Sequence, residues 1–439
     1  MAKDFPHASA LEGIRFTAQI GVPNIVQGLF SKRELPVKIA SRLGTDHLGY
    51  QLVEGLVKRH GPGPFYVRVA TDEALLITHP DDLKFVLGGS PDPFASDPEP
   101  KVKGMAAFQP DALTISRGDL WAQRRQFADA VCKPDQPLHP LATSWVGIAA
   151  DSARELAGKP IHWQDIDAAF LRMIRRVVLG DSAADDTTIT DLLGELMSQG
   201  NKMPGEPGPQ YPEFISRIQR YIDKAEPGSL ASEVPGAPTP PGGAAGQMVH
   251  WMFALKANQA ANVLRALAVL ATHPEQQREA RREVADADLS TASGVASLEY
   301  LGGCLLEAMR LWPTVGLLVK VAHRDVEFPS GAVLPEGRQL LIYNVFNHRN
   351  RDRIPYADKF SPGEWVSGSA GQDWSFNFFS HGPQNCPGAG ISVFLGQAVM
   401  ANLIKAGPLS VSGVHLDPGK PLPHGVDLFG LQVKSTGTV

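Results

Sequence analysis

Apolar residues recur at every third or fourth position over most of the chain, a spacing typical of amphipathic helices. Helical spacing covers residues 48–57, 81–87, 120–131, 141–200, 212–225, 247–272, 276–287, 301–311 and 391–404. The stretch at 247–272 is the longest uninterrupted helix predicted, and it ends at His273-Pro274 because proline cannot continue a helix. Helices therefore dominate the predicted fold.

Short apolar runs between prolines and glycines predict a smaller set of strands. These runs cover residues 65–69, 74–78, 315–321, 324–328 and 339–343, the first two forming a hairpin. The stretch 88–110 is rich in Pro, Gly and Asp, which predicts a long loop, and within 200–247 the helix at 212–225 is flanked by Pro/Gly-rich segments. Because no low-complexity spacer divides the chain, we predict one domain over residues 1–439, mainly α with a smaller β region (α+β).

Composition and charge exclude several classes of protein. With 43% hydrophobic and 20% charged residues the chain is ordinary and globular. Its net charge of -5 argues against a nucleic-acid partner, because binding a polyanion needs a basic face. Residues 1–16 show neither a signal peptide nor a run of about 20 apolar residues. We therefore expect a chain that is not membrane-bound.

Only three cysteines occur, Cys132, Cys304 and Cys386, and they form no CxxC pair or spaced cluster. Their spacing disfavours a disulfide framework and a zinc site. A reducing compartment suits such a chain, so we expect a cytoplasmic location.

Cys386 lies in a loop of small residues, Phe379-Ser-His-Gly-Pro-Gln-Asn-Cys-Pro-Gly-Ala-Gly390, directly before the apolar stretch 391–404. A thiol at a helix N-terminus is more easily kept as thiolate, because it lies at the positive end of the helix dipole. Phe379 can cover the sulfur, while Gly382 and Gly388 allow a flat ligand to approach closely. A thiolate bound axially to haem iron has these requirements; the alternative is an inert buried thiol.

The order Phe379, Gly382, Cys386, Gly388 resembles the haem-binding loop of the cytochrome P450 superfamily. Three further elements resemble the family in the right order, so the resemblance runs from the helix at Trp121 to the end of the stretch 391–404. It implies the cytochrome P450 fold, with haem b between the long central helix and the helix after the cysteine. Cys386 is then the iron ligand, and Phe379, Gly382 and Gly388 contact the haem.

Four positions resemble the family's contacts with the haem propionates. Trp121 and Arg125 lie four apart on one helical face, as in the family's Trp-x-x-x-Arg element, and a guanidinium can bind a carboxylate bidentately. Without the haem, the same spacing would describe an amphipathic surface helix. Lys320 stands near the place of a propionate-binding arginine, and Gln384 replaces a common Arg or His donor.

Glu307 and Arg310 match the family's Glu-x-x-Arg pair, one helical turn apart. The family completes this pair with an arginine at the position of Glu364 in this chain. A second carboxylate cannot take the part of that arginine. We therefore expect a rebuilt pairing, with Arg310 between Glu307 and Glu364.

The long central helix departs from the family pattern at its middle. Ala254 is the residue expected against the haem, and Leu255, Ala257 and Asn258 replace the family's glycine, acid and threonine. In the family the acid and the alcohol deliver protons for dioxygen activation. Ala257 cannot relay a proton, and Asn258 hydrogen-bonds but does not titrate.

Three interpretations of this site stay open. We expect an oxidoreductase, a haem-thiolate monooxygenase that takes its protons from ordered water or from a polar substrate group. The alternative is a peroxide user, either a peroxygenase or a hydroperoxide-rearranging enzyme, because both branches also lack the usual pair. The peroxygenase arginine–proline signature and the longer cysteine loop of the second branch are missing here. A haem sensor without turnover is the third interpretation.

The expected substrate is a hydrophobic small molecule. Helical spacing directs His250 and Phe253 toward the same pocket face as Ala254. His250 either binds a polar or carboxylate end of the substrate or is satisfied within the helix packing. The other expected pocket residues are Leu255, Val315, Leu317 and Leu318.

The resemblance implies a separate electron donor, a ferredoxin with its reductase, because no flavin or iron–sulfur module is recognised in the sequence. Arg117, Arg124 and Lys133 flank the Trp121 helix and form either a basic docking patch or a solvated charged face. We expect a monomer.

Overall fold

The computed structural model describes residues 4–435, and at Ala257 it describes the backbone alone. Most of the described chain is helical. The α-helices are α1 Ala10–Phe16, α2 Val22–Val26, α3 Glu34–Leu43, α4 Thr45–His60, α5 Pro80–Gly88, α6 Glu99–Met105, α7 Gly118–Cys132, α8 Ala142–Leu156, α9 Trp163–Leu179, α10 Thr187–Gly200, α11 Tyr211–Lys224, α12 Gly243–Phe253, α13 Gln259–Thr272, α14 Pro274–Asp286, α15 Ala292–Ala296, α16 Glu299–Leu311, α17 Asn344–Asn347, α18 Gly363–Val366 and α19 Ala389–Ala406.

The strands form three sheets among the described residues. They are β1 Phe65–Val69, β2 Asp72–Ile77, β3 Phe94–Ala95, β4 Pro160–Ile161, β5 Leu317–Ala322, β6 Val326–Glu327, β7 Val333–Leu334, β8 Gln339–Tyr343, β9 Leu409–Ser412 and β10 Gln432–Ser435. The largest sheet has the order β1-β2-β8-β5-β3. These elements confirm the predicted mainly helical fold with a smaller β region.

The five-stranded sheet brings distant segments to one edge. β1 and β2 form the predicted hairpin, β2 pairs in parallel with β8, and β8 pairs with β5 in antiparallel fashion. The edge strand β3 pairs with β5 through Phe94 opposite Ala322 and Ala95 opposite Val321. This register places Ser96, directly after β3, next to Lys320 on β5.

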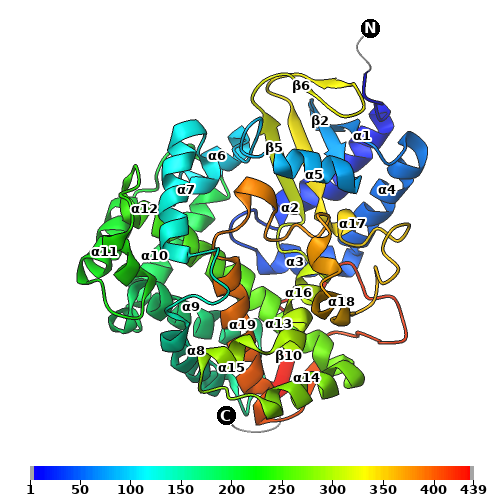
Figure 1. The fold of residues 1–439 in the computed structure, drawn as a ribbon. Helices are drawn as coiled ribbons and strands as arrows, with labels where there is room; N and C mark the ends of the chain where they lie inside the picture. The colour runs from blue at the N-terminus through cyan, green and yellow to red at the C-terminus, as the bar shows by residue number, and fades with distance from the viewer. Residues whose placement is uncertain (1–3, 436–439) are drawn as a thin grey trace.

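The helices α13, α16 and α19 pack together in the centre of the molecule (Figure 1). Helix α19 is apolar on all sides and packs against α8, α15 and α16 as well. It is long and apolar enough to cross a membrane, but 67% of it is buried inside the fold. Its composition therefore reflects a core helix, and it holds the loop with Cys386 at its N-terminus.

Two predictions about local structure were incomplete. The stretch 88–110 is no plain loop, because it contains β3 and α6. The stretch 247–272 is not one regular helix either. A π-helical turn at Ala254–Asn258 separates α12 from α13, and π-bulges occur frequently at functional sites.

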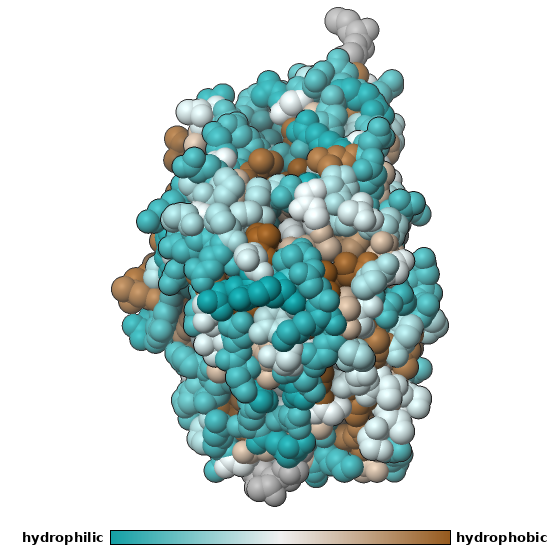
Figure 2. Space-filling view, turned by 90° about the vertical axis from the view of Figure 1, so that its left-hand side faces the viewer, coloured by the Kyte–Doolittle hydropathy of each residue, from teal (hydrophilic) through white to brown (hydrophobic). Residues whose placement is uncertain are grey.

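The face over α10, α11 and α12, on the left of Figure 1, is mostly hydrophilic, with apolar residues in small separate groups (Figure 2). Helix α11 illustrates how this surface is made. It buries Phe214, Ile218, Tyr221 and Ile222 and leaves its charged residues in solvent. Most helices of the described chain follow this amphipathic rule.

Candidate active site

The loop before α19 holds Cys386 in a fixed backbone conformation. The Cys386 N–H donates to the Phe379 carbonyl at 2.7 Å, which closes the loop on itself. Gly382 has a φ of +68°, and a Cβ there would lie 2.6 Å from the carbonyl oxygen of Leu87. Backbone strain and close approach together require glycine at this position. A Cβ at Gly388 would meet no protein atom within 4 Å, so protein packing does not explain that glycine.

The thiol of Cys386 is less easily ionised than its place at a helix N-terminus predicts. Burial raises the pKa of Cys386, and it outweighs the lowering effects of the Gly388 N–H and of Arg125. The helix dipole alone therefore does not keep the sulfur as thiolate.

Arg125 fastens this loop to helix α7. Its Nη1 donates to the carbonyl oxygens of Pro383 at 3.0 Å and Asn385 at 2.7 Å, and Nη2 donates to Asn385 Oδ1. Its Nε donates to both carboxylate oxygens of Asp129. Arg125 thus lies beside the cysteine loop with its donors bound to protein atoms, and its predicted contact with a propionate stays a prediction. Trp121 is half-buried one turn earlier on the same helix.

Lys320 and Gln384, both predicted to contact the haem propionates, meet next to the five-stranded sheet, and that role stays a prediction. Lys320 Nζ donates to Gln384 Oε1 at 2.6 Å and to Ser96 Oγ at 2.7 Å. Lys320 is only 1% exposed. Burial, and after it the charge of Lys101, lowers the pKa of Lys320 to about 7.

A second lysine, half-buried but with an enclosed ammonium group, lies in the same place, and the sequence did not indicate it. Lys101 Nζ donates to the carbonyls of Ser96 and Thr114 and to the Thr114 hydroxyl at 2.7 Å. Burial lowers its pKa to about 8. Lys101 stands in a stretch predicted as a loop, where a lysine is normally exposed, so no local signal could have identified it.

Neither lysine forms an ion pair with a carboxylate in the described part of the chain. The nearest acidic side chain, Asp97, pairs instead with Arg117 and contacts His323. Buried charges are normally paired, because an isolated ion in a protein interior is costly. Two adjacent buried cations therefore favour a ligand with two negative groups, which is the charge that the haem propionates carry.

The π-helical turn at Ala254–Asn258 contains the three positions that depart from the family pattern, Leu255, Ala257 and Asn258. Ala254 and Asn258 keep some accessible surface, whereas Leu255 is 8% exposed and packs in the main hydrophobic core. Lys256 points away from this side, because its Nζ lies close to Gly194 on α10. The side chain of Ala257 is outside the described atoms.

His250 and Phe253 lie on the last turns of α12 and contact the segment after α6. The Phe253 ring is 5.3 Å from the Phe108 ring, and His250 Nδ1 is 3.0 Å from Gln109 Oε1. Burial lowers the pKa of His250 to about 4, and the charge of Lys101 adds to this effect. Gln109 is fully buried, and its Nε2 has no partner among the described residues. The sequence indicated His250 of this neutral pair, but nothing in the sequence indicated Gln109.

The predicted pocket residues on β5 do not share one side. Side chains alternate along a strand, so Leu318 and Lys320 lie on one face of β5. Leu317 lies on the other face, where it packs against the cluster around Tyr50 and Phe65. Leu317 and Leu318 therefore cannot line the same wall, which corrects the prediction. Val315 precedes the strand and is 45% exposed.

Glu307 and Arg310 form the predicted ion pair, with two contacts of 2.7 Å and no exposed surface on either side chain. Glu364 takes no part in it, because its carboxylate accepts from Ser369 on the surface. The expectation of Arg310 between two carboxylates was therefore wrong. The Trp365 indole and the Ser361 N–H donate to Glu307.

Backbone carbonyls complete the other half of this network. Arg310 donates to the carbonyl oxygens of His348, Ala357 and Lys359 at about 3 Å. The nearby Arg349 is also buried, and it pairs with Asp358. The two buried arginines thus each have a carboxylate partner, so this network stabilises the fold behind the cysteine loop.

The basic docking patch is not formed. Arg124 is 5% exposed and pairs with Asp111, so it is not a surface residue. Arg117 pairs with Asp97, and Lys133 pairs with Glu233 at 2.6 Å. These three positions are therefore neutralised within the protein.

Comparisons with known proteins find similarity to one family over part of the chain. The family model "Cytochrome P450" matches residues 247–414, which include the central helix, the Glu307–Arg310 pair and the cysteine loop. Cytochrome P450 4A10 of Rattus norvegicus is 35% identical over 123 residues, 27% of this chain and 24% of that protein. Cytochrome P450 4A24 of Sus scrofa is 31% identical over 142 residues, 31% of this chain and 28% of that protein. The matched region thus spans about a quarter of these relatives.

A solved structure extends the likeness to nearly the whole chain. Retinoic acid bound cyanobacterial CYP120A1 superposes with a TM-score of 0.68 and covers 87% of this chain and 93% of that one. Its sequence identity is 16%, so it establishes the fold. The fold predicted from the resemblance is confirmed.

Proposed function

We propose that this chain belongs to the cytochrome P450 superfamily and is a haem-thiolate monooxygenase that oxidises a hydrophobic small molecule. One observation carries the proposal. A cysteine in a glycine-containing loop lies in the same site as two buried lysines that lack a carboxylate partner among the described residues. The thiol is an iron ligand and the lysines are counter-charges for two carboxylates, so this donor set fits haem b.

Haem, when bound through a thiolate, supplies an iron centre that cleaves the O–O bond. Cys386 would hold the iron, and Lys101 and Lys320 would hold the propionates. The Gly388 N–H lowers the pKa of the Cys386 thiol and would help to keep its sulfur anionic. Arg125 fixes the loop carbonyls on the other side, so the sulfur keeps its position.

In this proposal, the protons that the reaction consumes come from water or from the substrate. Asn258 does not titrate, and Lys256 lies next to α10. His250, with a pKa of about 4, is neutral near pH 7 and is therefore a hydrogen-bonding group there. The oxidant is dioxygen, with electrons from a separate ferredoxin and its reductase.

The proposed substrate has a long apolar body and one polar end. The rings of Phe108 and Phe253 offer apolar contact, and His250 with Gln109 offers a neutral polar contact beside them. Retinoic acid, which the structural neighbour binds, has this shape and is a suitable first probe. A type I spectral shift with retinoic acid that weakens about tenfold in His250→Leu, because a hydrogen bond is lost, would support this contact. An equal shift in both proteins would contradict it.

The thiolate is tested by the ferrous, carbon monoxide-treated protein. We expect a red-shifted Soret band, and Cys386→Ser should abolish it. The control Cys304→Ala should keep the band, because Cys304 is buried in the core and is not part of the cysteine loop. If the band persists without Cys386, the proposal is wrong.

The oxidant is tested by comparing turnover with a ferredoxin system and dioxygen against turnover with hydrogen peroxide alone. Turnover that requires reductase and dioxygen supports the monooxygenase. Product formation with peroxide alone would instead favour a peroxygenase, and spectral binding without any product would favour a sensor. We propose a cytoplasmic location as well, since all three cysteines are free thiols.

A further inference from the structure

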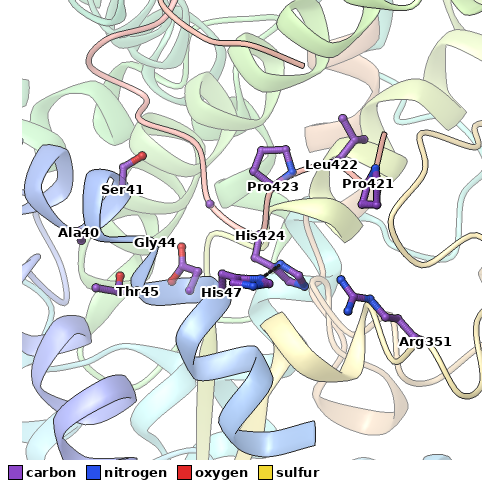
Figure 3. Close-up of a pocket in the computed structure, with 12 residues that line it drawn as sticks. Ala40, Ser41, Gly44, Thr45, His47, Arg351, Pro421, Leu422, Pro423 and His424 are labelled. Carbon is purple, nitrogen blue, oxygen red and sulfur yellow. Dashed lines mark hydrogen bonds between the residues drawn. The ribbon is translucent and has the colours of Figure 1, made fainter. Parts of the chain in front are cut away.

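Two histidines that lie far apart in the sequence meet at a cavity of about 260 Å³. The end of α3, the start of α4, residues 421–425 and Arg351 line this cavity (Figure 3). His47 and His424 point toward each other there, with their Nδ1 atoms 3.1 Å apart. Neither histidine belongs to the haem site described above, so the pair needs an explanation of its own.

The second ring nitrogen of His424 is buried without a partner. Only 4% of His424 is exposed, and its Nε2 has no hydrogen-bond partner among the described residues. A carboxylate oxygen, Asp358 Oδ1, lies 3.9 Å from this Nε2, which is too far for a hydrogen bond. Buried polar atoms are normally hydrogen-bonded, so the place of Nε2 opposite a carboxylate calls for a reason.

A hydrogen bond between the two rings places only one of their protons. The donor ring keeps its proton on Nδ1, so its own Nε2 is a lone pair. A metal ion held by both Nδ1 atoms places a proton on both Nε2 atoms instead. His424 Nε2 is then always a donor, and it faces Asp358 as a donor should. The buried nitrogen opposite the carboxylate therefore favours a metal ion between the rings.

The electrostatics around the pair permit a cation. Burial, and after it the charge of Arg349, lowers the pKa of His424 to about 2, so the ring is neutral near pH 7. A proton therefore does not compete with a metal ion for this ring. Arg349 and Arg351 both pair with Asp358, and Asp46 adds a second carboxylate on the cavity wall.

The distance between the two nitrogens fits one metal ion. Zinc binds imidazole nitrogen at about 2.0–2.1 Å, so two such nitrogens on one ion lie roughly 2.9–3.4 Å apart, depending on the angle at the metal. The observed 3.1 Å falls within this range. Imidazole suits Zn²⁺, Cu²⁺ and Ni²⁺, whereas Mg²⁺ and Ca²⁺ prefer oxygen ligands. The pair therefore selects a divalent transition metal.

We propose that His47 and His424 bind one divalent transition-metal ion through their Nδ1 atoms, and that Asp358 orients His424. A ligating histidine normally donates its other N–H to a carboxylate, which fixes the tautomer and the direction of the ring. The described residues contain no cluster of three or more His, Cys, Asp or Glu ligands. Water therefore fills the remaining positions on the ion, and the cavity has room for it. The bound ion fastens the start of α4 to residues 421–425.

The test is isothermal titration of the purified full chain, freed of metal by a chelator, with Zn²⁺, Ni²⁺ and Cu²⁺. We expect one ion per chain, with Cu²⁺ bound most tightly of the three. His47→Gln should weaken binding by at least about tenfold, because it removes one of two protein ligands. His47 is exposed, so this variant should keep its fold. Zn²⁺ should raise the Tm of the parent and leave that of His47→Gln unchanged.

The matched control is His415→Gln, which removes an exposed histidine outside the cavity and should bind the metal as the parent does. Electron paramagnetic resonance of bound Cu²⁺ should show two imidazole nitrogens in the parent and one in His47→Gln. Equal affinity of the parent and His47→Gln overturns the proposal, as does absence of binding. Binding that Cys386→Ser abolishes would assign the ion to the cysteine loop and would also overturn it. None of these measurements uses turnover, so their outcome is independent of the proposed function.

Discussion

The charges around Arg310 and those around Lys320 are equally deeply buried, yet they serve different purposes. Arg310 has a carboxylate, four backbone carbonyls and a complete set of hydrogen bonds. Lys320 has an amide oxygen and a hydroxyl, and a second lysine nearby lowers its pKa further. A buried charge with full compensation holds the fold together, whereas a buried charge without a counter-charge indicates a ligand.

We expect the largest loss of stability where a buried charge loses its only carboxylate partner. Glu307→Gln leaves Arg310 charged and buried, which costs about 3–5 kcal/mol in the free energy of unfolding. Urea unfolding followed by circular dichroism measures this cost. A variant as stable as the parent would show that the carbonyl oxygens alone neutralise Arg310, and the comparison between the two regions would fail.

The second largest effect should be on ligand binding, with little change in the stability of the fold. Lys320→Met removes the buried cation that we propose to pair with a propionate, and it should speed haem loss by about a hundredfold. Transfer of haem to an excess of apomyoglobin measures the rate. Haem dimethyl ester, which carries no carboxylates, is the matched control, and the substitution should leave its loss almost unchanged. Equal effects on both ligands would mean that Lys320 only supports the local structure.

The same lysine predicts how haem binding depends on pH. In the protein without haem, Lys320 has a pKa of about 7, and adjacent carboxylates raise that pKa again. The bound state then holds more protons, so haem affinity falls as pH rises above about 7, by up to tenfold per pH unit. Lys320→Met should flatten this dependence. An unchanged slope in the variant would assign the effect to another group.

We expect the smallest loss of stability at Glu364, the residue that replaces the family's arginine. Glu364 contacts only surface serines, so Glu364→Ala should change the free energy of unfolding by less than about 0.5 kcal/mol. Urea unfolding measures it under the conditions used for Glu307→Gln. A loss close to that of the buried glutamate would place Glu364 in the network after all.

Local patterns in the sequence predicted much of this protein. The helices around the cysteine loop follow from apolar spacing, and the strands of the hairpin follow from short runs bounded by Pro and Gly. The Glu307–Arg310 pair follows from one helical turn. These features depend on residues close together in the chain, so their spacing is enough to predict them. The resemblance to a known family was visible for the same reason.

Tertiary structure decided what depends on the packing of distant segments. Lys101 becomes a buried cation only because residues 96 and 114 fold over it. Glu307 is satisfied by Trp365 and Ser361, which a sequence pattern cannot indicate. His47 and His424 lie far apart in the sequence, and only the fold brings them to one cavity. Burial of a charge or of an apolar face is a property of the neighbours, and the chain order does not specify which neighbours pack there.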